Sequence, residues 1–282
     1  MNASREAGGE QEKLWNGLAA QAWVEAEALL DRTFKPIEEL LVAEVCANSP
    51  GRVLDVGCGT GVTTVGVARR LGTQARCTGI DISETMLAAA RARAERAGVH
   101  VDFIRASAQD HAFHSASFDS IMSRFGVMFF EDFTAAFANL RRAAADRGEL
   151  RCITWRSMTD NPFMTTAERV AAPLLPDLPP RKPDGPGQFA LADEPRVREI
   201  LERSGWMSVE LRPLDIPCTM PENALVSYLT RFGPVGRALM QMDAPSRDRI
   251  VEAVRPAFDS YVDGADVRFT AACWMIAARG RA

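Results

Sequence analysis

Apolar and polar residues follow two different spacings along the first half of the chain. Short apolar runs have the length and composition of buried parallel strands, and they lie at about 53–56, 75–81, 101–105, 118–122 and 149–155. Stretches with helical spacing lie between them, among them residues 62–71 and 133–142. Ser83 followed by Glu84 is typical of a helix N-terminus. This alternation predicts an α/β fold around a mostly parallel sheet.

The second half of the chain has a different pattern. Residues 156–190 contain so many prolines that neither a long helix nor an inner strand is expected there. The remaining predictions are helices at about 163–172, 193–203, 222–242 (broken at Gly233 and Pro234) and 246–260, and strands at 207–213 and 267–277. The interval between the last two strands, residues 215–265, is long and predicts a helical cap.

A glycine loop follows the first strand. Gly57, Gly59 and Gly61 stand at alternate positions directly after the apolar run and before a helix. Such glycines permit positive φ and let a ligand approach the backbone, next to the free N–H groups of a helix N-terminus. A dinucleotide site would need its third glycine at position 62, where the chain has Val62.

The run from Asp55 to Gly61 resembles the first motif of class I S-adenosylmethionine-dependent methyltransferases. The resemblance implies that this loop, including Cys58, wraps the methionine half of S-adenosylmethionine, while Asp55 helps to hold its ammonium group. Asp81 ends the second strand, where a carboxylate can accept both ribose hydroxyls of a nucleoside. The alternative for Asp81 is a helix cap.

Residues 123–130 resemble the segment after strand four in the ubiquinone/menaquinone-biosynthesis branch of this family. The resemblance covers about residues 12–155 with specific motifs. It implies a cofactor site whose remaining members are Trp15, Trp23, Ile82, Met86, Ser107, Ala108, Gln109, Ser123, Arg124 and Phe125. The product of such an enzyme is S-adenosylhomocysteine.

The resemblance also implies a Rossmann-like, seven-stranded, mostly parallel sheet with an antiparallel last strand and helices on both faces. Residues 46–157, 193–215 and 265–282 would form this core. Residues 1–45 would be an N-terminal helical segment over the cofactor site. Residues 158–192 and 216–264 would be cap or lid insertions.

The sequence identifies no catalytic residue, and its candidates are His111 and Arg124. The alternative for His111 is packing near the adenine loop, and the alternative for Arg124 is a structural salt bridge. The family's Asp/Asn-Pro-Pro-aromatic tetrapeptide for base and glutamine amino groups is absent after strand four. A nucleophilic cysteine is also absent there, and Glu131 and Asp132 suit a helix start better than a metal site. We therefore expect metal-independent, in-line methyl transfer to a small, fairly apolar acceptor through oxygen, nitrogen or carbon.

Composition narrows the expected partners. A formal charge of −4 gives no electrostatic reason to expect nucleic acid, and no apolar run approaches the length of a membrane span. The scattered cysteines and the polar N-terminus suit a cytoplasmic protein, as a monomer or homodimer. Two alternatives stay open. One is a catalytically degenerate, cofactor-binding or regulatory protein on this fold, and the other is a nucleotide-dependent oxidoreductase.

Overall fold

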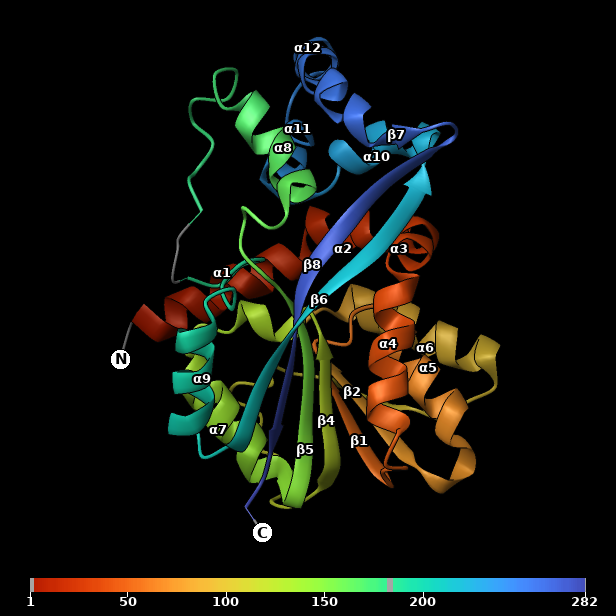
Figure 1. Ribbon diagram of the computed structural model, residues 1–282, viewed down its shortest axis with the longest axis vertical. Coiled ribbons are helices and arrows are strands. Elements are labelled where there is room, and N and C mark those ends of the chain that lie inside the picture. Colours follow the sequence, from red (N-terminus) through yellow and green to blue (C-terminus); the bar gives the residue numbers. More distant parts are fainter. Residues whose placement is uncertain (1–2, 182–184, 282) are drawn as a thin grey trace.

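One sheet runs through the middle of the molecule. The computed structural model describes residues 3–181 and 185–281, so residues 182–184 of the expected cap, with residues 1–2 and 282, lie outside the described part. The strand order is β3-β2-β1-β4-β5-β8-β6, and a short β7 pairs with β8 (Figure 1). The strands are β1 (Arg52–Val56), β2 (Arg76–Asp81), β3 (Asp102–Arg105), β4 (Phe118–Arg124), β5 (Ala144–Trp155), β6 (Met207–Pro221), β7 (Val262–Asp263) and β8 (Asp266–Arg279).

Strand directions confirm the predicted α/β fold. β1 is parallel to β2 and β4, β2 is parallel to β3, and β4 is parallel to β5. The last strand, β8, is antiparallel to both β5 and β6. Parallel strands place their carboxyl ends on one edge of the sheet, and open α/β folds bind ligands at that edge.

Helices cover both faces of the sheet. In Figure 1, α4, α5 and α6 lie on one face, and α7 and α9 lie on the other. The α-helices are α1 (Ala3–Asn16), α2 (Leu18–Glu25), α3 (Glu27–Thr33), α4 (Lys35–Cys46), α5 (Val62–Leu71), α6 (Glu84–Ala97), α7 (Phe133–Ala143), α8 (Pro162–Ala171), α9 (Glu194–Arg203), α10 (Leu225–Leu229), α11 (Gly233–Leu239) and α12 (Ala244–Val254).

The predicted helix starts have clear local causes. The Ser83 hydroxyl accepts a hydrogen bond from the Met86 amide at 3.3 Å, which caps α6. Asp132 caps α7 in the same way by accepting from Ala135 at 2.8 Å. These caps satisfy backbone donors that a helix cannot satisfy internally, so the sequence locates both starts.

Two strands are longer than predicted. β5 begins at Ala144, because this residue pairs with Phe118 before the register shifts toward Glu149. β6 continues through Pro213 and Pro217 to Pro221, well into the interval predicted as a helical cap. Proline is tolerated there because β6 is the edge strand of the sheet.

The helix expected over 222–242 is three separate pieces. A 3₁₀ turn, Glu222–Ala224, leads into α10, and α11 begins at Gly233 with Pro234 in its first turn. After α12, a further 3₁₀ segment, Arg255–Tyr261, replaces the end of the helix predicted over 246–260. Proline suits a first turn, where its missing N–H has no helical partner.

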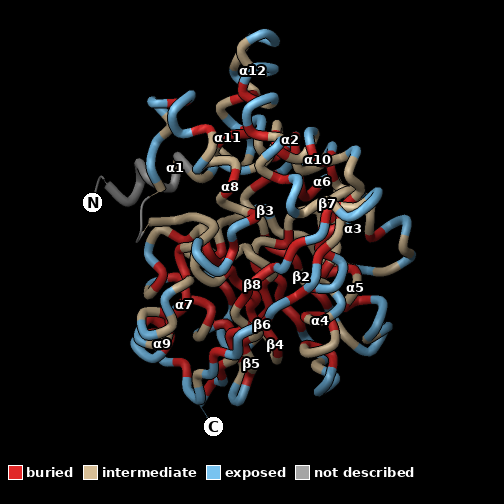
Figure 2. Tube along the Cα trace, turned by 45° about the horizontal axis from the view of Figure 1, so that its top comes forward, coloured by how far each residue is buried: buried red, intermediate tan, exposed pale blue. Residues whose placement is uncertain are grey.

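The long strands β6 and β8 extend past the other strands and reach the helices α8, α10, α11 and α12 (Figure 1). The N-terminal helices α1, α2 and α3 lie between those helices and the carboxyl edge of the sheet. Buried residues concentrate along the strands, whereas α12 is mostly exposed (Figure 2). No helix among the described residues is long and apolar enough to cross a membrane.

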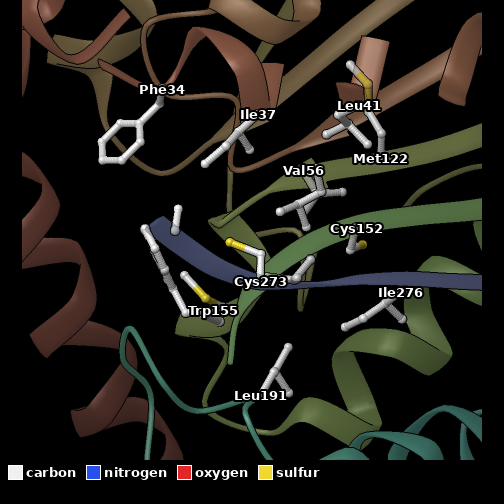
Figure 3. Close-up of a cluster of buried hydrophobic side chains, with 14 of the residues drawn as sticks. Phe34, Ile37, Leu41, Val56, Met122, Cys152, Trp155, Leu191, Cys273 and Ile276 are labelled. Atoms are coloured by element: carbon white, nitrogen blue, oxygen red, sulfur yellow. The ribbon is translucent and has the colours of Figure 1, made fainter. Parts of the chain in front are cut away.

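The hydrophobic core spans both faces of the sheet. Figure 3 shows Ile37 and Leu41 of α4 beside Val56 of β1, with Leu191 on the other side of Cys273. Ile37, Leu41, Leu191 and Cys273 are fully buried. Burying apolar side chains on both faces explains why the central strands are continuous apolar runs.

Candidate functional site

The glycine loop lies at the carboxyl end of β1, and its three glycines have different surroundings. All three have positive φ, at 66° for Gly57, 53° for Gly59 and 79° for Gly61. A Cβ atom on Gly57 would lie 2.7 Å from the Gly126 Cα, whereas one on Gly59 would meet only the Met86 sulfur at 3.6 Å. Gly57 therefore permits close backbone packing, and Gly59 borders more open space.

Asp81 joins this loop to the end of β2. Its carboxylate accepts hydrogen bonds from the Gly59 amide at 2.8 Å and the Ser83 amide at 2.9 Å. Burial raises the pKa of Asp81, and those two hydrogen bonds oppose the shift. The cap of α6 is Ser83, so Asp81 does not serve as the helix cap that was its alternative role.

Asp55 is buried beneath the loop, near the end of β1. Its Oδ2 accepts a 2.6 Å hydrogen bond from the Thr64 hydroxyl of α5. Burial raises the pKa of Asp55 to about 7, although the Thr64 bond and the charge of Arg124 oppose the shift. A nearby cation would favour the ionised form of this carboxyl group.

Arg124 ends β4 on the same edge. Burial lowers the pKa of its guanidinium, while the charges of Asp31, Asp55 and Glu38 oppose the shift. Among the residues that the structure describes, no carboxylate forms a direct ion pair with Arg124. The salt bridge considered from the sequence is therefore not formed, and three acids lie near a cation without contacting it.

An aromatic wall continues from Arg124. Phe125 has a φ of 68°, which is unusual for a bulky residue, and its ring stacks on Trp155 with centroids 4.7 Å apart. Phe34 contacts both rings edge-on, at 6.2 Å and 6.1 Å. Strained backbone often accompanies functional sites, and here it presents an apolar surface at the ligand edge.

Ser123 holds the turn after β4. Its hydroxyl donates to the Val56 carbonyl at 2.7 Å and accepts from the Gly126 and Val127 amides, each at 3.1 Å. The side chain is fully buried. One donor and two acceptor sites are thus used within the protein, which favours a positioning role for this hydroxyl over contact with a ligand.

The loop after β3 is also engaged internally. The Ser107 hydroxyl accepts from the Gln109 amide at 3.2 Å, and Ala108 is buried. The Gln109 carbonyl oxygen accepts from the amides of Glu131 and Asp132, each at 3.0 Å. The side-chain oxygen of Gln109 therefore holds the segment before α7 in place.

The side chains of His111, Cys58 and Met86 pack against other parts of the protein. The His111 ring lies edge-on to Phe113, with centroids 4.6 Å apart, as the packing alternative predicts. Burial raises the pKa of the Cys58 thiol, and its sulfur points toward Gly79 of β2. Met86 is buried under Gly59. Met86 and Cys58 therefore pack inside the protein around the glycine loop, and His111 packs on Phe113.

The N-terminal helices reach the site through tryptophans and one polar side chain. Trp15 lies edge-on to Trp23 at 6.1 Å and to Phe129 at 5.1 Å. The Asn16 amide donates to the Ile82 carbonyl, and its oxygen accepts from the Glu84 amide, both at 3.2 Å. Asn16 was not identified from the sequence, because a polar residue near the end of a polar helix carries no distinctive signal.

Arg93 is a second residue that the sequence did not reveal. From α6, its Nε donates to the carbonyl of Thr60, in the glycine loop, at 2.9 Å. Its Nη2 donates to Asp31 at 2.6 Å and to Glu27. Both acids belong to α3, so the contacts join segments that are far apart in the sequence.

A hollow of about 420 Å³ lies between α4, α5 and α6, lined in part by Glu38, Gly66 and Arg93. Its lining residues all belong to these three helices and include neither Asp55 nor Asp81, so we do not assign it to the candidate site. Within residues 3–181 and 185–281, no group of three or more histidine, cysteine, aspartate or glutamate side chains is arranged to hold a metal ion.

Comparison with known proteins adds to this geometry. Residues 53–148 match the family described as a methyltransferase domain. The demethylmenaquinone methyltransferase of Listeria welshimeri is 33% identical over 102 residues, which are 36% of this chain and 43% of the Listeria protein. The match thus spans less than half of that relative.

Solved structures share the fold. A putative methyltransferase of Bacillus halodurans has a TM-score of 0.58 at 16% identity, covering 87% of this chain and 99% of that one. A phosphoethanolamine N-methyltransferase of Haemonchus contortus, solved with S-adenosyl-L-methionine, has a TM-score of 0.53 at 17% identity, covering 87% of this chain and 52% of that one. Residues 53–148 thus match a methyltransferase domain, and the chain is similar to S-adenosylmethionine-dependent methyltransferases, the demethylmenaquinone methyltransferases among them.

Proposed function

We propose that this protein is a methyltransferase that transfers the methyl group of S-adenosylmethionine to a small, fairly apolar acceptor. The observation that carries the proposal is the loop from Gly57 to Gly61, joined to the Asp81 carboxylate, with Asp55 directly before it and the charge of Arg124 near Asp55. When bound, the cofactor supplies a sulfonium-activated methyl group. The protein has to bind it, align the acceptor and exclude water.

The donor set fits this cofactor. Gly59 has a positive φ and no side chain to keep a ligand from its backbone, and the Asp81 carboxylate keeps acceptor capacity beyond its two amide bonds for the ribose hydroxyls. Asp55, at the end of β1, suits the ammonium group of the methionine half, and that cation would oppose the effect of burial on its pKa. The Arg124 guanidinium, which has no direct ion pair among the described residues, suits the carboxylate.

We assign the acceptor to the apolar side of the same edge. Phe34, Phe125 and Trp155 form one wall, and Trp15 with Phe129 forms another. The aromatic rings favour an apolar acceptor. No side chain is assigned as a general base, and in-line transfer without a metal needs one only when the acceptor is protonated.

The proposed lid consists of the N-terminal helices with residues 158–192 and 216–264. Trp23 of α2 lies edge-on to Phe232 of the proposed lid at 5.6 Å, and Arg231 pairs with Glu25 at 3.3 Å. These contacts link the two parts of the proposed lid. Closing such a lid would exclude water from the reacting atoms.

Two alternatives are less well supported. An oxidoreductase would need a dinucleotide loop, and Val62 occupies the position of its third glycine. A catalytically degenerate protein would keep the fold, yet the three glycines, Asp55 and Asp81 are all present. The second alternative is separated from the proposal by turnover with candidate acceptors.

Calorimetry with the purified chain tests the proposal. We expect S-adenosylhomocysteine and S-adenosylmethionine to bind at micromolar strength, and NAD and NADP to give no heat of binding. Binding of a nicotinamide dinucleotide together with no response to S-adenosylhomocysteine would overturn it.

A further inference from the structure

The contacts of Arg93 connect the N-terminal helices to the glycine loop. This residue lies on α6, with Thr60 33 positions before it and Glu27 66 positions before it in the sequence. One edge of the guanidinium bonds the Thr60 carbonyl, while its Nη2 bonds Glu27 and Asp31 of α3. A single rigid, planar group thus contacts both segments.

These ion pairs are more enclosed than a typical surface pair. The side chains of Arg93, Glu27 and Asp31 are only 16%, 22% and 27% exposed. On the same helix, Arg91 pairs with Glu84 while the two are 45% and 48% exposed. Exposed pairs contribute little to stability, whereas removing one member of an enclosed pair leaves a charge without compensation.

Thr60, which accepts the Arg93 hydrogen bond, belongs to the glycine loop that is proposed to surround the cofactor. Thr60 stands between Gly59, whose amide bonds Asp81, and Gly61. A Cβ atom on Gly61 would lie 2.9 Å from the Cβ of Ala90, one turn before Arg93 on α6. The loop is therefore held against α6 by close packing at Gly61 and by the Arg93 hydrogen bond at Thr60.

We propose that Arg93 is a positioning residue that couples the docking of residues 18–33 to the ligand-binding geometry of the glycine loop. This inference rests on the proposed function. Because one guanidinium bonds both segments, ordering of the loop by the cofactor favours docking of α2 and α3. Docking of those helices in turn favours the binding geometry of the loop, since coupling between two sites is reciprocal.

The experiment compares Arg93→Lys and Arg93→Met with the matched control Arg91→Met. Lysine keeps a charge for Glu27 and Asp31 but cannot reproduce the planar fork that also reaches Thr60. The readouts are S-adenosylhomocysteine affinity by calorimetry, thermal unfolding, and hydrogen exchange of residues 18–33 with and without that ligand. If Arg93→Met does not fold, Arg93→Lys is the test variant.

We expect both Arg93 variants to bind S-adenosylhomocysteine about ten- to a hundredfold more weakly, as for the loss of one hydrogen bond to a charged group. S-adenosylhomocysteine should protect residues 18–33 from hydrogen exchange in the unmodified chain and in Arg91→Met. It should no longer protect them in Arg93→Lys. The melting temperature of Arg93→Lys should equal that of the unmodified chain. A merely structural Arg93 would leave that ligand-induced protection intact.

Unchanged affinity in Arg93→Lys, or weaker affinity with full protection of residues 18–33, would overturn the coupling. Failure of the unmodified chain to bind S-adenosylhomocysteine would instead overturn the proposed function, and the coupling with it. The two failures are therefore distinguished by the unmodified chain alone.

Discussion

The glycine-loop edge and the helices above it are built by different interactions. At the loop, directional hydrogen bonds connect particular atoms, such as the Gly59 amide and the Asp81 carboxylate at 2.8 Å. Around α8, α10, α11 and α12, aromatic rings pack on one another. Phe163 of α8 stacks on Phe269 of β8 at 4.0 Å, and the partly buried Tyr228 hydroxyl has a thioether, Met164, as its hydrogen-bond acceptor. Apolar packing tolerates exchanges of similar volume, whereas the bonded loop does not.

The largest effect that would sharpen this comparison is expected for Gly59→Val. A β-branched side chain at a φ of 53°, with its Cβ 3.6 Å from the buried Met86 sulfur, should distort the loop and weaken S-adenosylhomocysteine binding on the order of a hundredfold or more. Gly72→Val is the matched control, since Gly72 has a φ of 65° and open space at the end of α5. Calorimetry should show normal binding in that control. Equal losses in both variants would attribute the effect to backbone strain alone.

Asp81→Ala is expected to have the next largest effect. Removing a carboxylate that accepts from Gly59 and is proposed to accept the ribose hydroxyls should lower S-adenosylhomocysteine affinity by about one to two decades. Circular dichroism should show an intact fold, and Asp110→Ala, at an exposed position, serves as a control. Unchanged affinity would limit Asp81 to holding the loop.

A pH dependence centred on Asp55 should be smaller. The bound ammonium group would favour the carboxylate, so affinity should rise as pH increases toward 7 and level off above it, with a limiting slope of about tenfold per unit. Stability of the free protein should respond in the opposite direction. Because the pKa of Asp55 is raised from 3.8 in the folded protein, its contribution to the free energy of unfolding is fully present below pH 3.8. That contribution is lost as the pH rises through about 7.

Asp55→Asn separates that dependence from other titrations, because asparagine can still accept the Thr64 hydroxyl. Binding measured from pH 6 to pH 8 should become nearly flat in this variant. A slope that persists in Asp55→Asn would assign the titration to another group.

The smallest expected effect concerns the proposed lid. Hydrogen exchange should show that S-adenosylhomocysteine protects the glycine loop and residues 15–34, while residues 216–264 gain further protection only when an acceptor is added. Identical exchange of residues 216–264 in the free, cofactor-bound and acceptor-bound protein would remove the lid from the mechanism and leave those helices a structural role.

Local sequence signals predicted the sheet half well, for identifiable reasons. The helix start at Ser83, the glycines before α5 and the apolar strands each depend on a few neighbouring residues. The extension of β6 to Pro221 depends on pairing with β8, about fifty residues later. Periodicity within one segment contains no such information.

The candidate site was predictable to a similar extent. Asp55, Asp81 and the glycines follow a motif, and the structure brings them together at one edge. Arg93 was not predictable, because its partners on α3 lie more than sixty residues away and it resembles any other arginine on a polar helix face. The oxygen of Gln109 likewise bonds backbone amides 22 and 23 positions later.

The prolines of β6 also affect how the sheet ends. Pro213, Pro217 and Pro221 stand at every fourth residue, so all three would direct a backbone N–H to the same side of the strand. Pairing with β8 is continuous across them, which places the missing donors on the free edge. A strand from another molecule would find N–H groups missing there at every second hydrogen-bonding position. The edge strand is therefore protected by its own sequence against sheet-to-sheet aggregation.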